Sequence, residues 1–260
     1  MSARWRRMIK KMSRVAGSPK RALGFVWLRM LPFGILSADP YAIQAVTASY
    51  GRMPRIPLRE VFPGIENVDV ALIRPFDELS ETSTDPREIL IISAIARLLR
   101  PRNILEIGTS QGNTTLNLAA NTPDDTSITT VDLPADWNHQ FSLTVPTRFA
   151  GGVTGGRDVG RLFKNHPYSR KITQILQDSA QLDWKAMPTP FDLVFLDGCH
   201  YFDYVVKDTE NALRYSRPGG IIIWHDYGTI KHVSKAVDRV GRRANVKVIQ
   251  GTTLAVGRAE

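Results

Sequence analysis

The sequence predicts an α/β fold, with helices on both faces of a doubly wound, mostly parallel sheet. Short apolar runs alternate with longer segments of helical periodicity, the pattern of strands joined by crossover helices. The run at residues 103–107 passes through a glycine turn into a helical segment at 113–120. Residues 191–227 have the length of a complete strand-helix-strand unit. Because such a crossover is right-handed and returns the chain parallel to its start, we expect parallel neighbouring strands.

The turn after the first strand is the best candidate for a ligand site. Residues 104–107 are apolar except for Glu106, as expected of a strand that is buried on both faces. Gly108 and Gly112 permit a sharp turn and a close approach of the backbone to a ligand. The spacing Glu-x-Gly-x-x-x-Gly lacks the Gly-x-Gly-x-x-Gly fingerprint of dinucleotide-binding folds, so an ordinary strand-to-helix turn is the alternative.

Two further strands end in polar residues that suit a nucleoside. Residues 127–132 end at Asp132, 24 residues after Gly108, near the ~20-residue offset at which an acid binds ribose hydroxyls. Residues 171–179 are expected to form a third strand ending in Asp178 and Ser179, which can bracket an adenine edge. An Asp at a strand end can also serve only as a helix cap.

The unit at 191–227 carries most of the predicted chemistry. We expect a strand at 193–196, a helix at about 202–215, a stop at Pro218-Gly219-Gly220 and a strand at 221–224. The two strands are then neighbours, ~4.8 Å apart.

An aspartate follows each of these two strands, so Asp197 and Asp226 should stand at the same carboxyl edge. Such carboxylates repel each other unless a cation lies between them, and a hard divalent ion with oxygen ligands fits. His200 comes three residues after Asp197 and could reach the same pocket.

At these positions the chain resembles the class I S-adenosylmethionine-dependent methyltransferases, whose fold is Rossmann-like with a reversed last strand. More narrowly, it is similar to the metal-assisted O-methyltransferases of the catechol, caffeoyl-CoA and macrolide-sugar types. The resemblance covers about residues 85–260, and its most specific part is FLDGCHYFDYVVKD followed by PGGIIIWHDY. The first eighty residues contribute nothing to it.

The resemblance implies which residues bind S-adenosylmethionine. The residues of the glycine turn would surround the methionine part, a following acid would bind the ribose, and the end of the third strand would hold the adenine. In that order they are Glu106, Gly108, Thr109, Ser110 and Gly112, then Asp132, then Asp178 and Ser179.

The resemblance also implies a divalent metal, with Asp197 and Asp226 as ligands and His200 as the general base; Asp197 and His200 are thus the predicted catalytic residues. Relatives usually have a carboxylate or amide where this chain has His225, and an imidazole suits a softer divalent ion better than Mg²⁺. Adjacent residues of a strand point to opposite faces, so His225 binds the same ion only if the chain leaves the strand there. The alternative for His225 is a packed histidine outside the ligand set.

The implied reaction is transfer of a methyl group to a hydroxyl of a small molecule or sugar. The sulfonium is already an activated donor, so the protein has to align the acceptor and deprotonate it. Cys199 is expected to be inert. Two alternatives stay open: a degenerate methyltransferase fold kept as a binding module, and a nucleotide-cofactor oxidoreductase, which should show the missing glycine fingerprint.

The segments around this core have their own signals. Residues 85–88 read as a capping box that opens a helix with a sheet-facing apolar stripe. Residues 233–240 read as a helix, and 246–256 as closing strands. The insertion at 134–170 is either a lid or substrate loop or a helix pair outside the core.

Composition supports one domain with an extension. The 260 residues, 43% of them hydrophobic, suffice for one large α/β core, and a single Cys suits a reducing compartment such as the cytoplasm. We expect a basic N-terminal extension at 1–40, a helical or irregular cap or lid at 41–84, and the methyltransferase domain at 85–260. Nothing in the sequence decides whether the chain forms a homo-oligomer.

The positive charge is concentrated in the extension. Residues 1–38 contain nine Lys and Arg and no acid, which equals the net charge of +9 of the whole chain. The rest is near neutral, so nucleic-acid binding at the catalytic face is not expected. Residues 22–38 are apolar but interrupted, and are shorter than the ~20 residues of a spanning helix. We favour a basic amphipathic helix on the domain or at a membrane surface over a signal or transit peptide.

Overall fold

The computed structural model describes residues 50–74, 84–137, 140–146 and 158–260. The predicted basic extension and its apolar stretch lie outside these residues, as do parts of the cap and of the 134–170 insertion.

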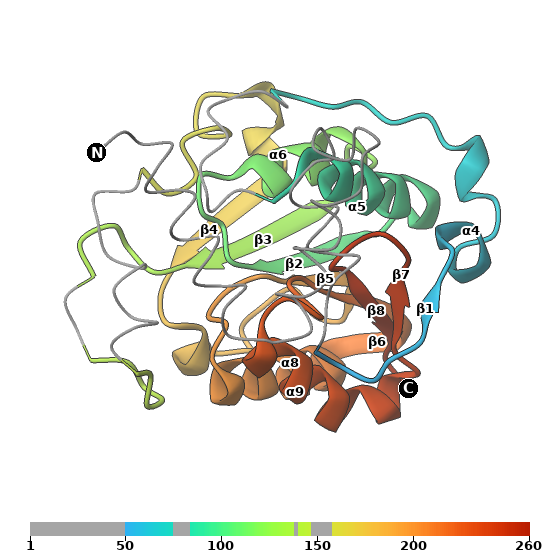
Figure 1. The fold of residues 1–260 in the computed structure, drawn as a ribbon. Helices are drawn as coiled ribbons and strands as arrows, with labels where there is room; N and C mark the ends of the chain where they lie inside the picture. The colour runs from blue at the N-terminus through green and yellow to red at the C-terminus, as the bar shows by residue number, and fades with distance from the viewer. Residues whose placement is uncertain (1–49, 75–83, 138–139, 147–157) are drawn as a thin grey trace, which may run out of the picture.

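An eight-stranded sheet forms the centre of the molecule, in the order β1-β7-β8-β6-β5-β2-β3-β4 (Figure 1). Every neighbouring pair is parallel except those of β8, which is antiparallel to β6 and β7. The prediction of a doubly wound, mostly parallel sheet with a reversed last strand is therefore confirmed. The strands are β1 (Arg55–Ile56), β2 (Asn103–Ile107), β3 (Ser127–Asp132), β4 (Ile172–Leu176), β5 (Phe191–Leu196), β6 (Ser216–Trp224), β7 (Lys247–Ile249) and β8 (Ala255–Arg258).

Helices cover both faces of this sheet. In Figure 1, α5 and α6 lie above it and α8 and α9 below it. Their bounds are α5 (Pro86–Leu99), α6 (Asn113–Ala120), α8 (Phe202–Tyr215) and α9 (Lys231–Val240), so the four helices expected within residues 85–260 are present. Short helices complete the described chain: α4 (Leu58–Val61), η2 (Ile65–Asn67), η3 (Pro167–Lys171), η4 (Ser179–Gln181) and η5 (Gly241–Ala244).

The central strands are apolar throughout because both of their faces are covered. Along β5, Leu193 and Phe195 pack in the cluster that contains residues of α5 and α6, whereas Val194 and Leu196 pack in the cluster of α8 and α9. All four are buried. The two faces of one strand therefore serve two separate cores, which explains the unbroken apolar run in the sequence.

Two strands differ from the prediction. β4 ends at Leu176, so Asp178 and Ser179 follow the strand, and Asp178 instead forms the N-cap of η4. β6 begins at Ser216, so the expected stop at 218–220 lies within the strand. Its register against β5 shifts there, which accommodates the extra residues as an irregularity at the exposed start of the strand.

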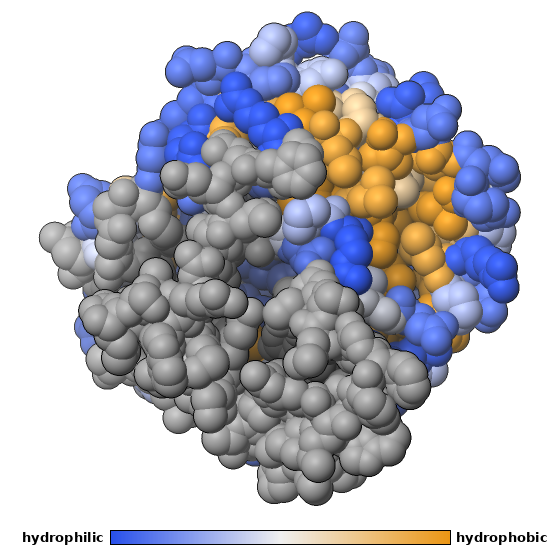
Figure 2. Space-filling view, turned by 45° about the horizontal axis from the view of Figure 1, so that its top comes forward, coloured by the Kyte–Doolittle hydropathy of each residue, from blue (hydrophilic) through white to orange (hydrophobic). Residues whose placement is uncertain are grey.

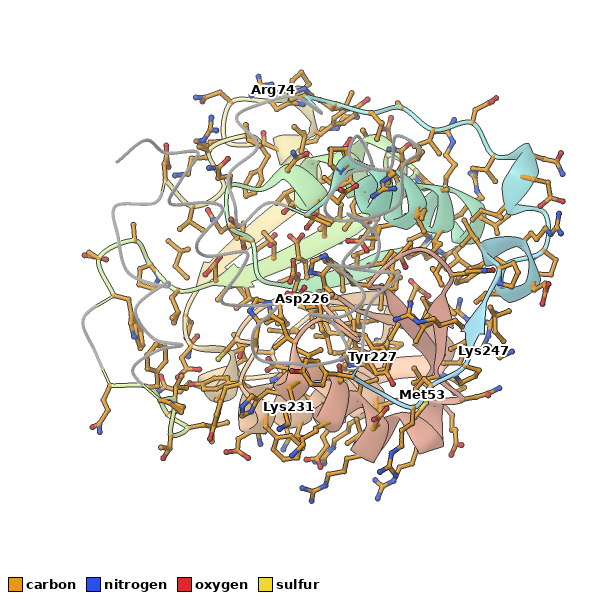
Figure 3. The ribbon with its side chains drawn as sticks, in the orientation of Figure 1. Met53, Arg74, Asp226, Tyr227, Lys231 and Lys247 are labelled. Carbon is orange, nitrogen blue, oxygen red and sulfur yellow. The ribbon has the colours of Figure 1, made fainter. Side chains whose placement is uncertain are left out.

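Residues 50–56 run along the edge of the sheet, where β1 extends it by pairing in parallel with β7. Tyr227 fixes this segment: its hydroxyl accepts hydrogen bonds from the backbone N–H of Arg52 (2.7 Å) and of Met53 (2.9 Å) and donates to Asp238 (2.5 Å). Figure 3 shows Tyr227 between Met53 and Asp226. The N-terminal segment is thus tied to the residue next to a predicted metal ligand.

Part of the surface is apolar. Figure 2, which brings the α5 side of the molecule forward, shows a continuous hydrophobic area bordered by hydrophilic side chains. Leu90 of α5 and Leu72 are among the exposed large apolar side chains. Within the described residues, no helix has both the length and the apolar character needed to cross a membrane.

We predict that Tyr227→Phe will loosen the N-terminal segment, because the N–H of Met53 loses its acceptor and the N–H of Arg52 keeps only the carboxylate of Asp238. The free energy of unfolding should fall by about 1–3 kcal/mol, as for an unpaired buried polar group. Hydrogen exchange at residues 50–56 should accelerate. Tyr168→Phe is the control, because the described residues offer its hydroxyl no hydrogen bond; equal exchange in both variants would contradict the role of Tyr227.

Candidate active site

The glycine turn lies directly against the end of β5. Gly108 and Gly112 have φ angles of +108° and +89°, which glycine adopts without strain. A Cβ at Gly108 would lie 2.2 Å from the carbonyl oxygen of Asp197. The absent side chain therefore allows the turn to approach the first predicted metal ligand.

Asp132 stands at the end of β3, beside the same turn. One oxygen of its carboxylate accepts a hydrogen bond from the N–H of Ser110 (2.7 Å), and the other accepts from the N–H of Leu133 (2.8 Å). Ser110 has a φ of +48°, so this bond holds a residue in the left-handed region. Asp132 therefore stabilises the turn in addition to lying where the ribose was predicted.

Glu106 lies beneath the turn and is fully buried. One carboxylate oxygen accepts hydrogen bonds from the hydroxyls of Thr130 (2.5 Å) and Thr115, and the other has no partner among the described residues. Burial raises the pKa of Glu106 to about 8, although the threonine hydrogen bonds oppose the shift. Thr109 joins the same network, since its hydroxyl lies 2.6 Å from that of Thr130.

Asp178 is a buried hydrogen-bond acceptor that gathers three segments. It accepts from the N–H of Ser142 (3.0 Å), the N–H of Ala180 (2.9 Å) and the hydroxyl of Tyr204 (2.7 Å). Burial alone would raise the pKa of Asp178, but these hydrogen bonds outweigh it and lower the pKa. The predicted adenine residue thus connects the 134–146 insertion to α8.

Aromatic side chains that the sequence analysis did not assign to the site extend from this point. Phe141 lies edge-on to Tyr204, with ring centroids 6.3 Å apart, and Trp137 lies 6.2 Å from Phe141. No local pattern indicated these side chains, because the insertion and α8 meet only in the fold.

A second buried acid accompanies Ser179. Asp208 of α8 accepts a hydrogen bond from Ser179, and one of its oxygens has no partner among the described residues. Burial raises the pKa of Asp208 to about 7, and the nearby charge of Asp178 adds to this shift.

Asp197, His225 and Asp226 form a compact cluster at the carboxyl edge of the sheet. Each offers one ligand atom, and these atoms all lie within 4.8 Å of one another. Nδ1 of His225 is 3.0 Å from Oδ1 of Asp197 and 3.7 Å from Oδ2 of Asp226. β5 and β6 are parallel neighbours, which confirms the expected placement of the two aspartates.

β6 ends before His225 and Asp226. His225 can face the same pocket as Asp226 only because the chain has left the strand at this point. The strand ends at Trp224, and Asp226 has a φ of +60°. Thr229 supports this turn by donating its hydroxyl to the Asp226 carboxylate (2.9 Å) and carbonyl (3.0 Å). The alternation of a regular strand is broken, so both side chains reach the cluster.

His200 completes the cluster from the turn after β5. Its Nε2 is 3.3 Å from Oδ1 of Asp197 and 3.3 Å from Oδ2 of Asp226. Burial tends to lower the pKa of His200, but the two carboxylates outweigh it and raise the pKa. Burial would likewise raise the pKa of Asp197 and Asp226, whereas the charges of His225 and His200 lower it.

Glu88 is a site residue that the sequence analysis missed, because its place near the start of α5 suggested a helix cap. Oε2 of its carboxylate is 2.9 Å from Nε2 of His225, and Oε1 accepts from the N–H (2.6 Å) and hydroxyl (3.0 Å) of Thr253. Glu88 is only 1% exposed. A buried carboxylate so placed fixes the ring orientation of His225 and turns Nδ1 toward the two aspartates.

A narrow cavity of about 10 Å³ adjoins the cluster, lined among others by Asp197, Cys199, His200 and His225. Its volume is about that of one water-sized sphere. Burial raises the pKa of Cys199 to about 11, so the thiol is protonated at neutral pH and is a poor nucleophile.

Comparison with known proteins agrees with this geometry. A family model described as a methyltransferase domain matches residues 105–227, whereas a search of curated proteins gave no match. Among solved structures, the O-methyltransferase from Bacillus cereus in complex with SAH is 18% identical, with a TM-score of 0.51, covering 69% of this chain and 84% of that one.

Two other solved structures cover more of this chain and have similar TM-scores. The O-methyltransferase TomG from Streptomyces achromogenes, described as involved in tomaymycin synthesis and solved with SAM, is 16% identical, with a TM-score of 0.51, covering 92% of this chain and 96% of that one. The SAH-bound Podospora anserina methyltransferase PaMTH1 is also 16% identical, with a TM-score of 0.55, covering 89% and 98%.

The chain therefore has the fold of the class I S-adenosylmethionine-dependent methyltransferases. Residues 105–227 match the model of a methyltransferase domain, and the resemblance inferred from the sequence is confirmed.

We predict that Asp208→Asn will stabilise the protein at neutral pH. Below about pH 4 the group is protonated in both states, and between about pH 4 and 7 only the unfolded chain ionises, so the wild type loses stability as the pH rises. At pH 8 the free energy of unfolding of the variant should exceed that of the wild type by about 2–4 kcal/mol. Near pH 4 the two values should be equal. Urea unfolding between pH 4 and pH 8 measures this difference in free energy, and Asp203→Asn at an exposed position is the control. A difference that does not change with pH would contradict the raised pKa of Asp208.

Proposed function

We propose that this protein transfers a methyl group from S-adenosylmethionine to a hydroxyl of a small molecule or sugar, with a divalent metal ion at the acceptor. One observation carries the proposal: the ligand atoms of Asp197, His225 and Asp226 lie within 4.8 Å of one another, and a Cβ at Gly108 in the cofactor turn would meet the backbone of Asp197. Cofactor and metal would therefore share one edge of the sheet.

The arrangement of the turn supports binding of the cofactor there. The backbone of residues 108–112 would face the methionine part, Asp132 the ribose, and Asp178 with Ser179 the adenine. When bound, S-adenosylmethionine supplies a methyl group already activated on a sulfonium. Glu106, held under the turn by two threonines, would support its shape from below.

The donor set fits a divalent ion. Two carboxylate oxygens and an imidazole nitrogen converge, and the imidazole favours a softer ion such as Zn²⁺ over Mg²⁺. A bound divalent ion would supply positive charge that favours the ionised form of the acceptor hydroxyl. Glu88 would act as a positioning residue, because it fixes His225 from the side opposite the aspartates.

His200 is the proposed general base. With a divalent ion supplying positive charge between the carboxylates, Nε2 of His200 would be unprotonated and could accept the proton of an acceptor hydroxyl brought there. The neighbouring carboxylates stabilise the imidazolium that results. The glycine turn and Asp197 would then hold methyl donor and acceptor side by side, which removes much of the entropic cost of bringing them together.

We predict that S-adenosylhomocysteine binds with or without metal, while methyl transfer needs the metal. Calorimetric titration should give similar affinity in excess chelator and in Mn²⁺, and release of S-adenosylhomocysteine in a test with catechol should stop in chelator. Asp226→Asn should weaken Mn²⁺ binding at least about tenfold, with the exposed Asp203→Asn as control. Full turnover in chelator would remove the metal from the proposal, and absence of cofactor binding would overturn it.

We predict that His200→Ala lowers turnover by about 10²- to 10⁴-fold, the usual contribution of a general base, and leaves the affinity for S-adenosylhomocysteine nearly unchanged. His166→Ala, at the N-cap of η3, is the matched control. A purely structural role would lower the thermal stability of the variant and preserve turnover per folded molecule. That outcome would exclude His200 as the base.

A further inference from the structure

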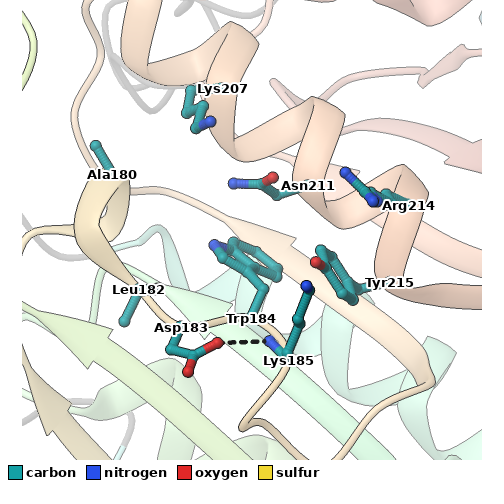
Figure 4. Close-up of a pocket in the computed structure, with 9 residues that line it drawn as sticks. All are labelled: Ala180, Leu182, Asp183, Trp184, Lys185, Lys207, Asn211, Arg214 and Tyr215. Atoms are coloured by element: carbon teal, nitrogen blue, oxygen red, sulfur yellow. Dashed lines mark hydrogen bonds between the residues drawn. The ribbon is translucent and has the colours of Figure 1, made fainter.

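A second cleft, of about 510 Å³, opens between α8 and the segment that connects β4 to β5 (Figure 4). Its volume falls within the range of small-molecule sites. None of its lining residues belongs to the cluster at Asp197 or to the glycine turn. The lining residues that matter here are Trp184, Lys185, Lys207, Asn211, Arg214 and Tyr215.

The cleft exists because this crossover has almost no helix. The chain passes from β4 to β5 across β3 and β2, and all of the connecting residues are described, yet η4 is the one helical element among them. Parallel crossovers usually carry a longer helix that would cover this side of the sheet. Trp184 fills part of the space, stacked on Tyr215 with ring centroids 5.6 Å apart.

Positive charge lines both walls of the cleft. Lys207, Asn211 and Arg214 have the i, i+4, i+7 spacing of one helix face, and Lys185 reaches toward Tyr215 from the connecting segment (Figure 4). No salt bridge to a described carboxylate involves Lys185, Lys207 or Arg214. Asp183 is the one acidic lining residue, and its carboxylate accepts the N–H of Lys185 (3.1 Å). Three cations against one acid leave the cleft positive.

The floor of the cleft holds an unused hydrogen-bond donor. Nε1 of Trp184 is buried and has no acceptor among the described residues. In Figure 4 this nitrogen faces the gap between Ala180 and Asn211. Buried donors are rarely left without a partner, and an oxygen bound in the cleft would satisfy this one once a small shift of the indole exposes the nitrogen.

We infer that this cleft binds a phosphorylated small molecule, as a site separate from that of methyl transfer. A phosphate monoester carries close to two negative charges at neutral pH, which matches the excess of two cations. Lys185 and Arg214 would hold the phosphate near Tyr215, and an apolar or planar body would lie over the Trp184 edge. The exposed acids Asp203 and Glu210 on the same helix would repel an extended polyanion, so a nucleic acid is a poorer match.

The test uses phenyl phosphate as the probe, with inorganic phosphate and phenol as its two halves. Nitrogen-labelled protein gives a separate indole N–H resonance for each tryptophan, and Trp184→Phe assigns the one in the cleft. Phenyl phosphate should shift that resonance and bind at least about tenfold more tightly than either half, with affinity that falls as salt is raised.

Charge-removing variants at exposed positions keep the test independent of folding. Lys185→Gln and Arg214→Gln should each weaken phenyl phosphate binding about threefold to tenfold, whereas Lys235→Gln on α9, the matched control, should not. An indole resonance unmoved at about 10 mM probe would overturn the inference. So would equal binding of inorganic phosphate, or equal weakening by Lys235→Gln. Cofactor binding at the glycine turn is measured separately, and its outcome does not affect the test of the cleft.

Discussion

The site depends on one electrostatic constraint, the placement of two carboxylates at the ends of adjacent parallel strands. Asp197 and Asp226 would repel each other in this half-buried edge, and positive charge must lie between them. Two imidazoles occupy that position in the protein, with His225 3.0 Å from Asp197 and His200 3.3 Å from each aspartate. The same side chains are those proposed to hold a divalent ion, whose charge would replace that of the imidazolium groups and leave His200 able to accept a proton.

Two backbone features make this cluster sterically accessible. Gly108 lets the glycine turn approach the Asp197 backbone, and the left-handed conformation of Asp226 releases the chain from β6. Next to it, Tyr227 turns away from the cluster and anchors the N-terminal segment through its hydroxyl. A strained residue persists only where its surroundings hold it, and here Thr229 bonds the carboxylate and carbonyl of Asp226 while the hydroxyl of Thr253 accepts its N–H.

Helix α5 contributes to the site from outside the matched methyltransferase domain. It packs Ile92 and Ile95 on the sheet, and this packing carries Glu88 into the interior, where its carboxylate joins His225 to Thr253. A carboxylate behind a ligating histidine tunes the orientation of the ring. The orientation of His225 in the proposed metal site therefore depends on a helix outside the matched region.

The sequence by itself determined the order of strands and helices, the glycine turn and the aspartates after β5 and β6, because local patterns and the handedness of crossovers encode them. It also indicated His200, which is three residues from Asp197. Tertiary structure alone decided that Glu88 pairs with His225, which is 137 residues away in the sequence. It also decided that the His225 ring faces the two aspartates. It also decided that β1 pairs with β7 and that the β4 to β5 connection leaves a cleft. These features depend on packing between distant segments, whose free energy no local pattern reports.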